Sequence, residues 1–391
     1  MKWLFWVAAA MIGYTYVGYA AWLWLRARLF PLPVQRAPFL PSVSVVMVVR
    51  DEDKVLERKL QNLFALDYPA GQMEIVVVSD GSTDATESIL WQYKDRPRFT
   101  VLVSGQSQGK ANGLNEAIRV AQGVIVLFTD ARQEIEPDAV RLLVENFADP
   151  SVGCVSGELN LGDRAAGESG KGMGLYWRIE KTVRELESAS GSVVGATGAL
   201  YAVRRELLVP LPPDTILDDV FLPMNVARQG SRVLFDGRAH AWDTPNLGDH
   251  REFARKVRTL SGNYQLLQLA PWLLGNSNPL RSEFISHKLL RLFAPFALVA
   301  ALLSSALVPE TLYRVWFVLQ VVFYGLAALS LVPIRLGFLG RLADAASTFV
   351  VLNAAAVVAF VNFVLRRKAV WTPISIPGTG SSTIASRRGV Q

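Results

Sequence analysis

Residues 74–93, EIVVVSDGSTDATESILWQY, decide the fold of this chain. The β-branched run at 74–78 predicts a strand that is buried on both faces, and the periodicity at 83–93 predicts a helix. Between them stands the turn SDGSTD (79–84), placed where a strand ends and a helix begins. Because open α/β sheets bind ligands at this edge, we expect Asp80 to contact a ligand.

The same alternation of strand and helix continues on both sides of this stretch. Further strands are expected at 42–49, 99–103 and 124–128, with helices at 55–64 and from Lys110 onward. Alternation of this kind predicts a parallel α/β sheet with crossover helices. Beyond Cys154 we expect longer amphipathic helices, around residues 175–186 and 253–264.

Apolar residues are concentrated towards the two ends of the chain. Of the 391 residues 51% are hydrophobic and only 19% are charged. Residues 3–25 carry no charge over a length that lets a helix cross about 30 Å of hydrocarbon, and they lack a signal-peptide cleavage site. They predict an uncleaved anchor. Three more apolar segments, at 292–308, 315–332 and 347–365, predict further membrane helices.

These segments divide the chain into four expected parts. They are a transmembrane anchor at 1–30, an α/β domain with interfacial helices at 41–265, a membrane region of about three helices at 266–370, and a flexible tail at 371–391. Four crossings would place both termini opposite the α/β domain. Arg366, Arg367 and Lys368 favour the other orientation for the C-terminus, so its side stays open.

The charge and the cysteine content argue against a nucleic-acid-binding protein and against a fold held together by disulfides or by a multi-cysteine metal site. The net charge of +6 is explained by basic residues next to the membrane segments, and no nucleic-acid-binding motif accompanies it. Cys154 is the sole cysteine. An intramolecular disulfide and a multi-cysteine metal site are therefore excluded.

Asp130 follows the strand expected at 124–128, so it lies at the same sheet edge as Asp80. A hard divalent cation, Mg²⁺ or Mn²⁺, prefers oxygen ligands and often bridges a carboxylate to substrate phosphates. The alternative for both aspartates is a purely structural turn or cap. Asp84, with Glu87 three residues later, is expected to cap the following helix.

A second carboxylate pair and a row of arginines complete the candidate residues. Asp218 and Asp219 diverge on any regular element, so one can act as a general base while the other is a cap. Arg251, Arg255 and Arg258 share one helical face and can bind a diphosphate in bidentate fashion. The alternative is a basic helix that rests on anionic lipid.

The order of these motifs resembles the family 2 glycosyltransferases, inverting enzymes of the GT-A fold that include cellulose, hyaluronan and chitin-oligosaccharide synthases. The resemblance runs from about Pro41 to the C-terminus. It rests on VRDE (49–52), SDGS (79–82), GKANGLN (109–115), Asp130, LDD (217–219) and RKVRT (255–259).

The resemblance implies a role for each of these residues. Asp80 would contact the nucleoside, Lys110 the nucleotide, and Asp130 the metal and the diphosphate. Asp219 would be the catalytic base, and Arg258 matches the arginine of the family's Q-x-x-R-W motif.

The resemblance also implies an activity and a place. The chain would be an integral protein of the plasma membrane with a cytoplasmic catalytic domain. It would transfer a sugar, with inversion, from a nucleotide diphosphate sugar of the UDP type to a lipid-linked or saccharide acceptor. Polysaccharide or glycolipid biosynthesis is the expected setting.

Two departures from the family pattern leave alternatives open. The D-x-D motif is DAR at 130–132, which removes the second metal-side carboxylate, and Thr259 replaces the tryptophan on which processive synthases rest the acceptor. Trp177 or Trp242 could stand in for it. The alternatives are a processive polysaccharide synthase with a transmembrane channel, and an inactive membrane scaffold or transport protein.

Overall fold

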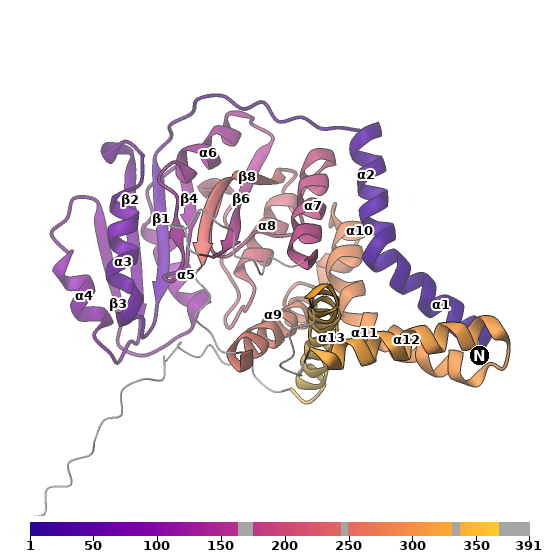
Figure 1. Cartoon of the computed structure of the whole chain (residues 1–391). Coiled ribbons are helices and arrows are strands. Elements are labelled where there is room, and N and C mark those ends of the chain that lie inside the picture. The colour runs from indigo at the N-terminus through magenta and orange to yellow at the C-terminus, as the bar shows by residue number, and fades with distance from the viewer. Residues whose placement is uncertain (163–174, 244–248, 331–336, 367–391) are drawn as a thin grey trace, which may run out of the picture.

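The computed structural model describes residues 1–162, 175–243, 249–330 and 337–366. An α/β domain lies at one side of the molecule and a group of long helices at the other (Figure 1). The tail expected at 371–391 lies outside the described residues.

A mixed sheet forms the centre of the α/β domain. Its spatial order is β3-β2-β1-β4-β7-β6-β8-β5. The strands are β1 (Val43–Val49), β2 (Met73–Asp80), β3 (Phe99–Ser104), β4 (Ile125–Phe128), β5 (Glu134–Ile135), β6 (Val152–Leu161), β7 (Tyr201–Arg204) and β8 (Arg232–Asp243). Strands β1 to β4 are parallel to one another, whereas β7 runs antiparallel to both β4 and β6. The expected α/β fold is confirmed, and the sheet is mixed rather than wholly parallel.

Helices cover both faces of this sheet, and α7 and α9 lie between the sheet and the long helices (Figure 1). The α-helices of the domain are α3 (Asp53–Phe64), α4 (Thr86–Gln92), α5 (Lys110–Val120), α6 (Ala139–Glu145), α7 (Leu175–Ser190), α8 (Asp218–Arg228) and α9 (Asp249–Leu269). Short 3₁₀ turns are η2 (Ala70–Gln72), η3 (Asn146–Ala148), η5 (Arg205–Leu207) and η6 (Pro271–Leu274).

Strands β6, β7 and β8 were not expected from the sequence beyond Cys154. Strand β6 buries Ser156, Glu158 and Asn160, and β8 buries Asp236, so neither strand shows an apolar run. Both lie in the sheet because their backbones pair with each other over almost their full length. Sheet pairing has overridden an unfavourable local sequence pattern here.

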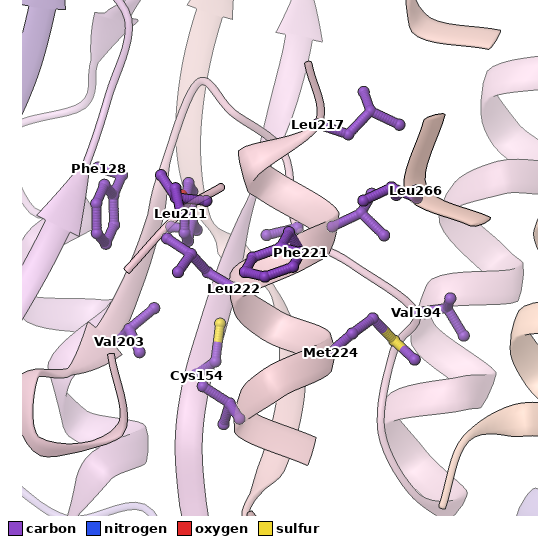
Figure 2. Close-up of a cluster of buried hydrophobic side chains, with 14 of the residues drawn as sticks. Phe128, Cys154, Val194, Val203, Leu211, Leu217, Phe221, Leu222, Met224 and Leu266 are labelled. Carbon is purple, nitrogen blue, oxygen red and sulfur yellow. The ribbon is translucent and has the colours of Figure 1, made fainter. Parts of the chain in front are cut away.

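The core fixes the position of helix α8. Val45 and Met47 of β1 pack on one face of the sheet, and the alternate residues Val46 and Val48 pack on the other. Figure 2 shows α8 packed on this second face, where its side chains Phe221, Leu222 and Met224 lie among apolar residues of the strands, the loops and α9. The other labelled residues are Phe128, Cys154, Val194, Val203, Leu211, Leu217 and Leu266. This packing holds the N-terminus of α8, with its two aspartates, against the sheet.

Four helical segments are long and apolar enough to span a membrane. They are Lys2–Leu29, which comprises α1 (Lys2–Gly13), η1 (Tyr14–Gly18) and α2 (Tyr19–Leu29); Arg281–Leu307, which comprises α10 (Arg281–Phe284), η7 (Ile285–Leu289) and α11 (Leu290–Leu307); α12 (Thr311–Leu329); and α13 (Gly337–Val364). The expected number of membrane helices is confirmed. Helix α1 packs on α11, and α13 packs on both α9 and α12.

A buried ionic cluster joins the anchor to the rest of the molecule. The ring of His287 lies between two carboxylates, 2.8 Å from Glu187 Oε1 and 3.0 Å from Glu180 Oε1. The hydroxyl of Tyr19 donates to Glu187 Oε1 at 2.6 Å. The cluster therefore connects α2, α7 and η7, and it gives His287 a structural place at the interface.

Candidate active site

Asp80 ends β2 and holds the loop that precedes α5. Its carboxylate accepts hydrogen bonds from the hydroxyl of Ser107 at 2.7 Å and from the backbone amides of Gln108 at 2.7 Å and Gly109 at 3.0 Å. Gly81, at φ +64°, leaves room for this loop, because a Cβ there would lie 2.3 Å from the Ser107 nitrogen. A carboxylate offers about four acceptor positions. Asp80 itself is only 1% exposed, so its carboxylate fixes this loop, and the nucleoside contact expected of Asp80 stays a prediction.

Asp84 supports the same turn. Its Oδ1 accepts from the Thr86 amide at 2.9 Å at the start of α4, and its Oδ2 accepts from the Asp53 amide at 3.1 Å at the start of α3. Asp84 thus binds the first amide of each of two helices. The expected capping pair with Glu87 is not formed, because the N-cap of α4 is Ala85 and Glu87 instead accepts from the hydroxyl of Ser79 at 3.4 Å.

Asp130 lies just beyond the end of β4, with its side chain 41% exposed. The loop that carries it is fixed from below by Lys59 of α3, a side chain that is only 1% exposed. The Lys59 ammonium donates to Thr129 Oγ1 at 2.8 Å and to the Gln133 carbonyl at 2.7 Å. Burial lowers the pKa of Lys59 to about 7, against the opposing attraction of Asp130. The carboxylate of Asp130 is thus exposed to solvent on a loop that Lys59 holds in place.

Lys110 joins Asp130 to the pair at the start of α8. Its Nζ lies 3.0 Å from Asp130 Oδ1 and 3.1 Å from Asp218 Oδ1. Burial disfavours the charge of Lys110, but the attraction of Asp130 and Asp218 outweighs it and raises the pKa of the ammonium. The structure therefore brings together residues that are far apart in the sequence and were singled out separately.

The two adjacent aspartates have different environments. Asp218 is buried, pairs with Lys110 and accepts a hydrogen bond from the Tyr201 hydroxyl at 3.2 Å. Asp219 is only partly buried, and its Oδ2 accepts from the Gly198 amide at 3.2 Å. Burial and the neighbouring Asp218 raise the pKa of Asp219 to about 6, against the attraction of Lys110. Of the two carboxylates, Asp219 is therefore the more exposed one, and its raised pKa suits the exchange of a proton.

Gly198 lies between the two sides of the site. A Cβ at this residue would be 3.5 Å from Oδ2 of Asp130 and 3.5 Å from Oδ2 of Asp219. Both carboxylates therefore border the same small volume. Their Coulombic repulsion also contributes to the raised pKa of Asp219.

The basic residues form a second layer around these carboxylates. Arg132 pairs with the buried Asp243 at the end of β8, and Asp243 also accepts from Gln133 Nε2 at 3.2 Å. Arg255 lies 3.7 Å from the same Asp243 oxygen. Arg132 therefore stands where the D-x-D pattern has its second aspartate, and its charge is neutralised by Asp243.

Arg258 lies one turn further along α9 and is close enough to the acidic group to be affected by its charge. Burial lowers its pKa, while Asp130, Asp218 and Asp219 oppose that effect by their charge. The side chain of Arg251 lies outside the described residues.

Three residues near the site were not among the sequence candidates. They are Lys59, Asp243 and Glu52. Burial and the charge of Asp130 raise the pKa of Glu52 to about 7, although Arg132 opposes the shift. Glu52 stands in the VRDE motif, so the sequence carried a signal for it. Lys59 on an amphipathic helix and Asp243 on an unexpected strand gave none.

The donor set permits one mode of cation binding. No cluster of three or more possible metal-ligating side chains occurs among the described residues. Asp130 nevertheless presents an exposed carboxylate, and a hard cation commonly uses one or two carboxylates together with substrate phosphates and water. The residues present fit a Mg²⁺ or Mn²⁺ ion that binds together with a diphosphate.

Comparison with known proteins identifies the class of this domain. Residues 44–209 match the model of the family described as Glycosyl transferase family 2. The chain carries a family 2 glycosyl transferase domain of the GT-A fold, followed and preceded by helices that are long and apolar enough to span a membrane.

Two curated relatives illustrate the similarity. The chain is 24% identical over 233 residues to poly-beta-1,6-N-acetyl-D-glucosamine synthase of Staphylococcus aureus (strain COL), covering 58% of this chain and 56% of the relative. It is 27% identical over 283 residues to beta-monoglucosyldiacylglycerol synthase of Synechocystis sp., covering 71% of this chain and 58% of the relative. The chain thus spans somewhat more than half the length of the curated relatives it matches.

A solved structure shares the fold over almost the whole chain. It is the mannosyltransferase PcManGT from Pyrobaculum calidifontis in complex with GDP-Man and Mn²⁺. The match has a TM-score of 0.72 at 24% identity and covers 93% of this chain and 99% of that one. The similarity includes the membrane helices as well as the α/β domain, because it extends over nearly all residues.

Proposed function

We propose that this protein is a membrane glycosyltransferase that transfers a sugar, with inversion, from a nucleotide diphosphate sugar to a lipid-linked or saccharide acceptor. The observation that carries the proposal is the arrangement of Asp130, Lys110, Asp218 and Asp219 at one end of the sheet. In this arrangement Asp130 is the carboxylate that would face the diphosphate, Lys110 is the cation, and Asp219 is the base with a raised pKa. Asp130 and Asp219 border the same small volume beside Gly198.

The proposed reaction is a single displacement. Asp219 takes the proton of an acceptor hydroxyl, which attacks the anomeric carbon while the bond to the diphosphate breaks, and this inverts the configuration. Lys110, Arg255 and Arg258 stabilise the charge that develops on the departing diphosphate. A divalent cation on Asp130 would supply additional electrostatic stabilisation of that diphosphate when bound. Asp80 holds the loop at 107–109 and contributes a contact to the nucleoside.

The relatives support the proposed acceptors and place. One is named for a polysaccharide and the other for a glycolipid, so both a saccharide and a lipid acceptor agree with the comparisons. The four candidate spans support an integral membrane protein. We place it in the plasma membrane with the domain in the cytoplasm, where nucleotide sugars are available, and we take the donor to be a UDP-sugar.

A donor screen tests this function. Purified full-length protein in detergent is incubated with UDP-glucose, UDP-N-acetylglucosamine and GDP-mannose, in each case with Mn²⁺, and release of the nucleoside diphosphate is measured. We expect release from one of these donors and its loss in Asp130→Ala, which lacks the exposed carboxylate. Metal dependence that is unchanged in Asp130→Ala would remove Asp130 from the cation-binding role.

The same screen addresses the rival class, an inactive scaffold or transport protein. Such a protein would release no nucleoside diphosphate from any donor. The raised pKa of Asp219 favours the enzyme, since perturbed pKa values of carboxylates cluster at functional sites.

A further inference from the structure

Lys59 of α3 is a buried lysine whose hydrogen-bond partners are uncharged. The residue is 1% exposed, and its Nζ donates to the hydroxyl of Thr129 at 2.8 Å and to the carbonyl of Gln133 at 2.7 Å. A fully buried lysine usually lies against a carboxylate, because neutral partners recover only part of the cost of removing an ammonium from water. The burial of Lys59 therefore costs folding free energy, and packing alone does not account for it.

The two hydrogen bonds enclose the loop that carries Asp130. Thr129 precedes Asp130 directly, and Gln133 follows it by three residues. One ammonium therefore ties the beginning of the loop to its end. The neighbouring Arg58 adds a third hydrogen bond from α3, from Nη2 to the carbonyl of Arg132 at 3.0 Å. The backbone around Asp130 is thus held by the side chains of one helix.

The hydroxyl of Thr129 carries this restraint towards the second carboxylate of the site, Asp219. It accepts from Lys59 and donates to the carbonyl of Ala199 at 2.8 Å. The preceding residue, Gly198, donates its amide to Oδ2 of Asp219 at 3.2 Å. A continuous set of contacts therefore runs from Lys59 to the segment that holds Asp219, and it bears on the separation of the two carboxylates.

Asp130 depends on such a restraint because it is the one aspartate left in the D-x-D pattern. The other position of the pattern is Arg132, which is paired with Asp243. A single carboxylate ligand binds a cation more tightly when its backbone is already ordered, because ordering it on binding costs free energy. In this chain the order comes from Lys59 rather than from a second carboxylate.

We propose that Lys59 is a positioning residue of the reaction. Through Thr129 it holds Asp130 and the segment at 197–199 at the separation that a divalent cation and a diphosphate require, and it contacts neither of them. The inference rests on the proposed function, which supplies the cation and the diphosphate. The competing explanation is that Lys59 serves only the stability of the fold.

The contribution of the cation to nucleotide binding tests this role. The full-length protein in dodecyl maltoside is dialysed to equilibrium against radiolabelled UDP or GDP, once with Mn²⁺ and once with EDTA. The ratio of the two affinities is the factor by which the cation tightens binding. A variant that is only partly folded binds less nucleotide under both conditions and keeps the same ratio. We expect the ratio to fall about 10-fold in Lys59→Met, which keeps an apolar side chain and removes both hydrogen bonds.

Matched variants show whether Lys59 acts through Thr129. We expect Thr129→Val, which removes the hydroxyl, to lower the ratio as Lys59→Met does, and Thr129→Ser, which keeps the hydroxyl, to preserve most of the ratio. The double variant of Lys59→Met with Thr129→Val should lose less than the two single losses combined, because both changes break the same contact. Fully additive losses would overturn the path through Thr129.

Asn62 provides a control on the same helix. It lies one turn after Lys59 and exchanges two hydrogen bonds with the backbone of Ile135, at 2.8 Å and 2.9 Å, beyond Gln133. Asn62→Leu should lower the melting temperature and leave the ratio unchanged. An unchanged ratio in Lys59→Met, or an equal loss in Asn62→Leu, would overturn the positioning role.

Hydrogen exchange in the ligand-free protein keeps this inference separate from the proposed function. Mass spectrometry of peptides that cover residues 129–133 compares wild type with Lys59→Met. We expect about tenfold faster exchange in the variant, because the loop loses two hydrogen bonds. Equal exchange would overturn the inference, whatever the nucleotides do. Faster exchange in Lys59→Met beside a wild type that binds neither nucleotide would contradict the glycosyltransferase and leave Lys59 as the anchor of the loop.

Discussion

At the scale of single residues, the structure gives two neighbouring aspartates, Asp218 and Asp219, different environments. Asp218 is buried and bound to Lys110 and Tyr201, whereas Asp219 keeps an oxygen available beside Gly198. We therefore expect Asp219→Asn to lower turnover by roughly two to four orders of magnitude while donor binding stays nearly unchanged. Single-turnover kinetics with a nucleotide titration measure both quantities. An active Asp219→Asn beside an inactive Asp218→Asn that still binds donor would reverse the assignment.

The raised pKa of Asp219 predicts a pH dependence. A general base works in its ionised form, and burial with the charge of Asp218 brings its pKa to about 6. We expect kcat/KM to be level above this pH and to fall about tenfold for each pH unit below it, since protonation removes the base. A profile measured from pH 5 to 8 checks this. Activity that stays flat down to pH 5 would contradict the role of Asp219.

At the scale of elements, sequence periodicity predicted the first half of the domain well. The strands β1 to β4 and the helices between them were confirmed; the apolar runs of β1, β2 and β4 are buried in the sheet, and β3 forms its partly exposed edge. Strands β6 and β8 were not predicted from the sequence because they bury polar residues such as Glu158 and Asp236. The pairing of Arg132 with Asp243 depends on β8, so this part of the candidate site could not be predicted either.

Gly198, in the loop before β7, offers a test of the space between Asp130 and Asp219. Gly198→Ala introduces a methyl 3.5 Å from Oδ2 of both Asp130 and Asp219, an ordinary contact distance. We expect the variant to fold, with a melting temperature close to wild type, and to lose about tenfold or more in kcat. The methyl desolvates both carboxylates and occupies space that the reacting sugar needs. Thermal unfolding and initial-rate kinetics give the two measurements.

A second glycine serves as a control that separates the effect of the position of Gly198 from the general effect of a glycine-to-alanine substitution. A methyl at Gly191 would also lie 3.5 Å from its nearest neighbour, here Arg26, and would contact neither Asp130 nor Asp219. Gly191→Ala should therefore keep wild-type kinetics. Equal losses of kcat in both variants would point to a general effect of alanine on folding and would argue against the proposed reaction volume.

At the scale of the whole molecule, the membrane helices are joined to the catalytic domain at two places. The buried cluster around His287 connects the anchor to α7, and α9 runs from the basic residues of the site to its contact with α13. Both connections hold the α/β domain against the candidate membrane helices.

Product length follows from the same arrangement. Processive synthases hold the acceptor on an aromatic platform, and Thr259 supplies none here; its hydroxyl is bound to the Arg255 carbonyl of its own helix at 3.1 Å. Trp242, a candidate substitute, donates its indole N–H to Glu136 at 2.7 Å. Loss of a stacked aromatic forfeits roughly 1–3 kcal/mol, which shortens acceptor residence by roughly one to two orders of magnitude.

We therefore expect one or a few sugars per encounter from the wild type. Thr259→Trp, which restores the platform, should lengthen the product, whereas Thr259→Ser should leave it unchanged because the helix-bound hydroxyl is kept. Mass spectrometry of the product at a low ratio of enzyme to acceptor measures the length. Long polymer beside unused acceptor in the wild type would show that another surface holds the growing chain, and Trp242→Ala would then be the variant that shortens it.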